Sequence, residues 1–468
     1  MINKAVLKIL IILGIFFAFS AVYKLLEKEQ IYNSTLGKMT LNYQRIDSSG
    51  ISMIKEMNKP FSAFVENNAY NWDAKYYKDI HDYMYEGSGI FIIYRYAFYP
   101  FFPMVWKLFQ VQSHGIVFLN YLFFALSLLL LSSIFLKDSK SEIFFFMLGL
   151  LLPTAIAFYL PYTEALFLLT FSIALIGLLK RKYWLFFIAM LCFSMTRPSA
   201  MILYVVFIIA NFISLLHHKQ ILRFLKECFL SILPIFTGWV IVMLMEYHYS
   251  GSWTSYMDAS YLWAKEPDLH KKVSDWSMEG FGMTSFALFA IAIPAIIYVI
   301  VWGVSALLGK KDESTPYLFS GDGEYIKTYL FNASLLFIMG TTIFNFMVGG
   351  YQLNGIFRYT MATPFFYIVF FQLPEKLKSI PVQYKVSGLL ILLFSILLFL
   401  LSTDYAGDIF RFKYLGLYLL LLLAPLVILE QYLPDKMKLF LLVLLVVPCL
   451  VWHAYLFNMY LSDAWIFT

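Results

Sequence analysis

The chain is a succession of apolar blocks of about 16 to 25 residues, the length at which a helix crosses roughly 30 Å of bilayer hydrocarbon. Of its 468 residues, 61% are hydrophobic and only 14% are charged, and the mean hydropathy is +0.73. Soluble domains carry about half apolar and a quarter charged residues. The blocks also lack the period-two alternation of a membrane β-barrel. The sequence therefore predicts an all-α polytopic membrane protein.

We expect about 11 to 13 transmembrane helices, with boundaries uncertain by a few residues. The candidates cover residues 5–25, 115–136, 142–160, 163–179, 183–196, 199–216, 228–247, 284–308, 328–347, 359–373, 386–402, 414–430 and 438–456. The short blocks 163–179 and 183–196 also fit tilted or re-entrant segments. The first block has the basic start and small-residue site of a signal peptide, but its apolar run continues to Leu26, which favours an uncleaved anchor. One transmembrane domain over 1–468 is expected, in which residues 26–114 form a long first loop with amphipathic helices.

The basic residues predict the orientation, because Lys and Arg concentrate in short cytoplasmic loops. With a cytoplasmic N-terminus, that side holds Lys4, Lys8, Lys137, Lys140, Lys180, Arg181, Lys182, Lys219, Arg223, Lys226, Lys310, Lys311, Lys327, Lys376, Lys378, Lys385, Lys436 and Lys438. The first loop and the C-terminus then lie outside the cytoplasm. Membrane orientation explains the net charge of +6, so we expect no nucleic-acid partner.

Polar and aromatic clusters gather in the loops that this topology places outside the cytoplasm. They are residues 71–74, 94–103, 161–164, 196–199, 251–253 and 357–359. Loops on the other side are short lysine-rich connectors such as residues 179–182. The predicted working surface is therefore extracytoplasmic.

Asp73 stands at the start of a helix predicted over residues 74–85, with Asn71 as the candidate cap. Helical spacing puts Asp73, Tyr77, Ile80 and Met84 on one face. A carboxylate near a helix N-terminus is held ionised by the helix dipole, which suits a general base. The alternative is that Asp73 only caps the helix.

Glu164, Arg197 and Arg358 each lie where an apolar helix begins or ends, and a charge at the bilayer centre costs about 3 kcal/mol. The guanidinium fork of arginine matches the oxygens of a phosphate, so Arg197 and Arg358 are candidates for a lipid phosphate or pyrophosphate. The alternatives are a helix cap for Glu164 and an interface anchor for Arg197.

Further candidates for substrate binding are Trp72, Tyr77 and Arg95 in the first loop and Trp253 in an aromatic segment that runs from Tyr247 to Trp263. Aromatic faces and hydroxyls suit a sugar, although Trp and Tyr also form interface belts in any membrane protein. Asp79, His81 and Asp82 match no metal-binding spacing and are better explained as a solvated helix face. We expect no metal and no cofactor.

Four ordered segments together resemble the PIG-V mannosyltransferase family, which adds a mannose during GPI-anchor assembly and has bacterial relatives. They are residues 72–80 (WDAKYYKDI), 97–103 (AFYPFFP), 161–167 (PYTEALF) and 196–198 (TRP), with a looser likeness at 251–263 and 358–359. The resemblance implies the GT-C class of bundles, whose members take a sugar from a polyprenyl-phosphate donor outside the cytoplasm with inversion. It also implies that Asp73 is the catalytic base and that the protein lies in a bacterial plasma membrane.

The sequence departs from the family at Ile80-His81, where Ile-Ala is frequent, and at Met84-Tyr85, where Gly-Tyr is frequent. These departures leave the acceptor open, as a lipid or a glycan. Three other functions stay as alternatives: a transporter or lipid flippase, a polysaccharide polymerase or ligase, and a structural scaffold. A transporter would show two related halves with broken helices at mid-membrane, and the sequence has no visible halves.

Overall fold

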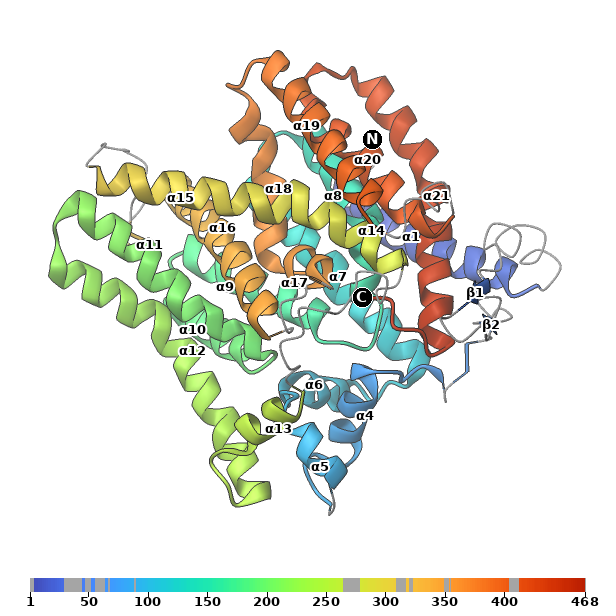
Figure 1. Cartoon of the computed structure of the whole chain (residues 1–468). Helices are drawn as coiled ribbons and strands as arrows, with labels where there is room; N and C mark the ends of the chain where they lie inside the picture. The colour runs from blue at the N-terminus through green and yellow to red at the C-terminus, as the bar shows by residue number, and fades with distance from the viewer. Residues whose placement is uncertain are drawn as a thin grey trace.

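The computed structural model describes residues 4–28, 44–46, 52–54, 64–65, 68–87, 90–263, 278–308, 317–319, 323–348, 353, 355–403 and 412–467. Lys310 and Lys311, part of the predicted cytoplasmic set, lie outside these residues. The chain folds into a bundle of helices (Figure 1). A short antiparallel pair, β1 (Gln44–Ile46) and β2 (Ser52–Ile54), lies in the first loop.

Eight described helices are long and apolar enough to cross a membrane. They are α1 (Lys4–Leu26), α7 (Ser113–Phe135), α11 (Ile202–His218) with the 3₁₀ turn before it, α12 (Ile221–Ser250), the continuous pair α14 (Met278–Ala287) and α15 (Ile293–Leu307), α16 (Gly323–Val348), α19 (Val382–Leu401) and α21 (Asp435–Leu461). Shorter apolar helices are α9 (Glu164–Leu179), α10 (Tyr183–Ser194) and α20 (Leu415–Ile428). The protein is therefore an all-α, multi-pass integral membrane protein, which confirms the predicted fold class.

Two predicted spans are wrong as continuous helices. The block 142–160 is split into α8 (Ser139–Leu151) and a 3₁₀ helix over Pro153–Phe158, because proline lacks an N–H and forces the preceding Leu152 into an extended conformation. The block 359–373 is split into α17 (Ile356–Met361) and α18 (Pro364–Leu377), where the Thr363 side chain caps the second helix by accepting from Phe366 N–H. Both breaks leave polar backbone and side chains inside the bundle.

The short helices α4 (Asp73–Tyr83), α5 (Ile90–Arg95), α6 (Phe101–Phe109) and α13 (Ser255–Trp263) lie together at one end of the molecule, at the bottom of Figure 1. The first three confirm helices in the long first loop. Aromatic contacts join them: Tyr76 stacks on Phe98 at 4.8 Å, and Trp263 of α13 meets the Tyr76 ring edge-on at 5.4 Å.

Lysine ion pairs mark the opposite end of the bundle. Lys4 and Lys8 of α1 both bind Glu142 of α8, and Lys140 lies 2.7 Å from Asp435 at the start of α21. Because α21 has 27 residues, its two ends are about 40 Å apart at 1.5 Å per residue. The sequence assigned Lys4, Lys8 and Lys140 to the cytoplasmic side. The structure places all three at the end of the bundle far from α4.

Candidate active site

Glu164 and Arg197 meet because α9 and α10 form a tight antiparallel hairpin. Glu164 is the first residue of α9, and Arg197 follows the end of α10, so both lie at the open end of the hairpin. The helices approach closely at Gly177, where an added Cβ would lie 2.6 Å from the Phe186 backbone nitrogen. Arg197 Nη1 lies 2.8 Å from Glu164 Oε1.

Arg358 of α17 joins this pair to Asp73 of α4. Its Nε donates to Glu164 Oε1 at 2.7 Å, and its Nη2 donates to Asp73 Oδ2 at 2.7 Å. Asp73, Glu164, Arg197 and Arg358 therefore form one four-charge cluster with two carboxylates and two guanidinium groups. The sequence had selected these residues separately from four distant segments.

Aromatic rings enclose the Arg358 guanidinium. Its Cζ lies 4.7 Å from the ring centre of Tyr162 and 4.6 Å from that of Phe467, with Trp465 at 5.8 Å. The C-terminal segment reaches this point beside Gly355, which has a φ of +73° and whose added Cβ would lie 2.8 Å from Phe467 O. Rings and cation attract each other more strongly when both are desolvated, so this cage holds the guanidinium in place.

The two carboxylates of the cluster differ in access to solvent. The Glu164 side chain is 0% exposed, whereas that of Asp73 is 24% exposed and its Oδ1 accepts no hydrogen bond from the described residues. Glu164 Oε2 and the hydroxyl of Tyr162 are buried without a hydrogen-bond partner in the same part of the structure. Burying such groups unpaired is costly, so they mark a place where a polar ligand would be accommodated.

The backbone before Asp73 is strained, and hydrogen bonds to Tyr460 of α21 hold it in place. Trp72 has φ 55° and ψ −127°, an unusual conformation for a residue with a side chain, which costs of order 1–3 kcal/mol. Tyr460 of α21 holds the segment: its hydroxyl accepts from Asn71 N–H at 3.1 Å and donates to Ala69 O at 2.9 Å. The Trp72 ring packs against Trp465 at 5.1 Å.

The expectation that Asn71 caps α4 is wrong. Its side-chain nitrogen donates to Tyr460 O at 2.7 Å, and Trp72, which occupies the cap position, makes no side-chain cap bond. The Asn71 side chain therefore contacts α21 and makes no local cap bond. Asp73 itself is the first helical residue and binds Arg358, so it is more than a local cap.

Tyr77 lies one turn after Asp73 and faces inward. Its ring meets Phe98 and Phe102 edge-on at 5.2 and 5.5 Å, which packs α4 on the aromatic segment 94–103. Tyr77 and Ile80, which helical spacing places on the same face as Asp73, are both buried. Burial raises the pKa of the Tyr77 phenol, because the ionised form would lose its hydration.

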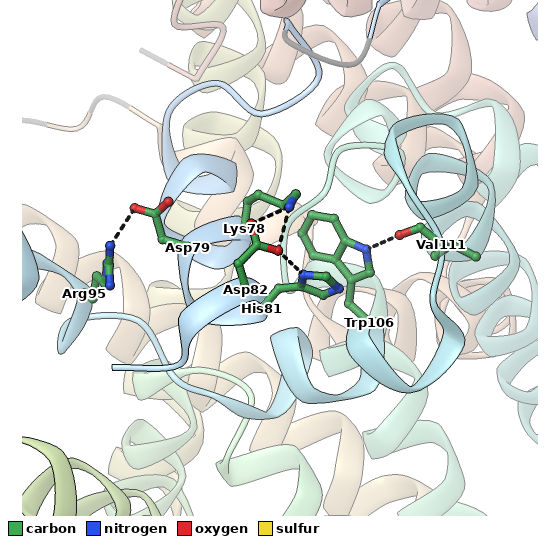
Figure 2. Close-up of polar contacts among 7 residues, drawn as sticks. All are labelled: Lys78, Asp79, His81, Asp82, Arg95, Trp106 and Val111. Carbon is green, nitrogen blue, oxygen red and sulfur yellow. Dashed lines mark hydrogen bonds and ion pairs between the residues drawn. The ribbon is translucent and has the colours of Figure 1, made fainter. Parts of the chain in front are cut away.

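The other carboxylates of α4 make local ion pairs away from the four-charge cluster (Figure 2). Arg95 donates to Asp79 Oδ2 at 3.4 Å and to Glu86 O at 3.1 Å, so this predicted ligand residue lies outside the cluster. Asp82 accepts from Lys78 at 2.6 Å and contacts His81. Burial opposes ionisation of Asp82, but these hydrogen bonds outweigh it and lower its pKa. Asp79 and Asp82 are partly exposed, whereas the His81 ring packs on Trp106 at 4.7 Å.

Trp253 also lies outside the cluster. It stacks on Tyr247 at 4.3 Å and is 53% exposed. Trp263, at the other end of the same segment, contacts Tyr76, Tyr94 and Phe98 of the first loop, and Tyr256 contacts Tyr99. Segment 251–263 therefore approaches α4 and α5 by a different tryptophan from the one that we selected.

The two arginines expected to hold a phosphate are bound by carboxylates in this structure. Arg358 is the more enclosed, with 5% of its side chain exposed, and it spans Asp73 and Glu164. Arg197 is 11% exposed and contacts Glu164 only through Nη1 among the described residues. Arg197 thus retains unused N–H groups for an anion, whereas Arg358 orients carboxylates.

Sequence reasoning missed Tyr162, Tyr460, Trp465 and Phe467, which enclose or hold the cluster. The signal for Tyr162 was available, since it directly precedes the Thr163-Glu164 helix start. In the described residues no group of three or more His, Cys, Asp and Glu side chains could hold a metal. Comparison with protein-family models, curated proteins and solved structures gives no match.

Proposed function

We propose that the protein is a membrane glycosyltransferase, with mannose as the favoured sugar, that uses a polyprenyl-phosphate donor. The observation that carries the proposal is the four-charge cluster: one accessible carboxylate, Asp73, contacts Arg358, and the buried carboxylate Glu164 binds both Arg358 and Arg197. Glycosyl transfer with inversion needs a base for the acceptor hydroxyl and cations for the leaving phosphate.

In this proposal Asp73 takes the proton from the acceptor hydroxyl as the acceptor oxygen forms its bond to the anomeric carbon. The bond from that carbon to the phosphate oxygen breaks, and its electron pair leaves with the polyprenyl phosphate. Arg197 binds the phosphate through its unused N–H groups. Glu164 and Arg358 are positioning residues, because they hold Arg197 and Asp73 respectively through 2.8 and 2.7 Å contacts.

The location of the cluster supports an extracytoplasmic acceptor. The cluster lies beside Tyr460, near the end of α21, and the lysine pairs lie at the start of that helix. If the lysine end faces the cytoplasm, as charge predicts, a helix about 40 Å long puts Asp73 on the other side.

The direct test is to incubate the purified protein with labelled polyprenyl-phosphate mannose and a panel of lipid and glycan acceptors. The proposal predicts labelled product with an inverted anomeric centre. Movement of the labelled lipid between vesicle leaflets with no transfer would instead favour the flippase.

A further inference from the structure

A second site lies at the end of the bundle remote from the four-charge cluster. A cavity of about 650 Å³ opens between α10, the beginning of α12 and the segment 317–319. Arg223 and Lys226 line it from α12, and Phe186, Phe187, Leu230 and Phe319 supply apolar wall. Since α12 has 30 residues, its opposite end, which leads to α13, lies about 45 Å away.

The two cations lack carboxylate partners. Arg223 and Lys226 are three residues apart and share one helix face, and no Asp or Glu among the described residues lies within salt-bridge distance of either. Arg223 instead lies over the Tyr317 ring at 5.1 Å and donates to Gln220 at 3.3 Å. The site therefore presents two positive charges that no carboxylate of the described residues neutralises through an ion pair.

The one carboxylate that lines the cavity is already engaged. Glu227 is buried, and its Oε2 accepts from Phe319 N–H at 2.9 Å. This hydrogen bond fixes the segment 317–319 as a wall of the cavity. It also directs that oxygen of the carboxylate toward the backbone.

The surroundings of the cavity are apolar and outward-facing. Trp184, Leu222 and Phe229 are 64%, 80% and 61% exposed, on the same two helices. In a membrane these side chains contact acyl chains, and tryptophan prefers the interface. A soluble anion would use the two cations but none of this apolar surface, whereas a phospholipid uses both.

We propose that this cavity binds a glycerophospholipid with a net negative headgroup, with its phosphate at Arg223 and Lys226 and its acyl chains along the apolar wall. Basic pockets between transmembrane helices on the cytoplasmic side bind acidic lipid headgroups by this combination of charge and apolar contact. The site is separate from the proposed sugar transfer and does not depend on it.

The test measures lipid binding to the full-length protein in detergent, by native mass spectrometry and by thermal stabilisation. Phosphatidylglycerol is compared with phosphatidylcholine, and glycerol phosphate tests the headgroup alone. Arg223→Gln with Lys226→Gln should weaken phosphatidylglycerol binding about thirtyfold, as expected when two interfacial cations are lost. Lys180→Gln with Lys436→Gln removes two exposed charges outside the cavity and should leave binding unchanged.

A second variant, Leu230→Trp, fills the cavity without changing its charge. It should also weaken phosphatidylglycerol binding while the melting temperature without lipid stays near that of the unmodified protein. Equal binding of phosphatidylglycerol and phosphatidylcholine, unchanged binding by the Arg223/Lys226 variant, or full competition by glycerol phosphate would each overturn the proposal.

Discussion

Arg358 Nη2 lies 2.7 Å from Asp73 Oδ2, although 285 residues separate the two in the sequence. The contact joins the long first loop to the break between α17 and α18. Because Arg358 also binds Glu164, a change at any one of these side chains alters the charge balance of the others.

Glu164→Gln should destabilise the protein by about 3 kcal/mol, the cost of leaving buried charges without their partner. Arg197 and Arg358 both bind Glu164 Oε1, and the glutamine lacks the charge that balances them. Thermal unfolding in detergent measures the change. Glu375→Gln, which removes an exposed partner of Lys378, is the control and should have little effect. Equal melting temperatures for the two variants would show that Glu164 does not anchor the arginines.

Arg197→Lys should raise the KM for the lipid donor by about tenfold or more, since an ammonium cannot reproduce the two-pronged contact of a guanidinium with phosphate. Initial rates with varied donor give this value. Arg181→Lys, at an exposed position in the turn between α9 and α10, is the control. An unchanged donor KM would make Arg197 an interface anchor.

Tyr460→Phe should lower transfer and reduce stability by about 1 kcal/mol, because it removes the hydroxyl that holds Ala69 and Asn71. Tyr159→Phe is the matched control, because the Tyr159 hydroxyl is also buried but has no hydrogen-bond partner among the described residues. The pair is compared by transfer rate and melting temperature. Similar activity in both variants would mean that α21 does not position the strained segment before Asp73.

The orientation can be tested with a reporter fused after Thr468. The charge distribution predicts an extracytoplasmic C-terminus, so a reporter that is active only outside the cytoplasm should give signal. Signal only from a cytoplasm-specific reporter would show that the orientation is the opposite one, with Asp73 on the cytoplasmic side.

The charged members of the site could be predicted from the sequence for a physical reason. A charge inside the bilayer is costly, so Glu164, Arg197 and Arg358, which border apolar blocks, stand out against their surroundings. Tyr460 and Phe467 do not stand out, because aromatic residues are frequent at every membrane interface. Their role depends on tertiary contacts that bring α21 and the C-terminal segment to the four-charge cluster. Helical periodicity carries no information about such contacts.

Some features of the fold could likewise be predicted from the sequence, and others could not. Apolar block length predicts the long spans, since it measures the distance that a helix must cross. The breaks at Pro153 and at Thr363-Pro364 fall inside blocks that are mostly apolar, so hydropathy alone merged each into one helix. Proline alone would not have located the breaks either, because Pro234, Pro425 and Pro448 lie inside continuous helices.

The most direct measurement is sugar transfer from a labelled polyprenyl-phosphate donor by Asp73→Asn. The account predicts a folded, membrane-inserted protein that still binds donor but transfers about 10² to 10⁴ times more slowly, because asparagine keeps the shape of the side chain but not its basicity. Asp79→Asn, on the same helix but paired with Arg95, should keep near-normal activity. Normal transfer by Asp73→Asn, or an equal loss in Asp79→Asn, would contradict the assignment of Asp73 as the base.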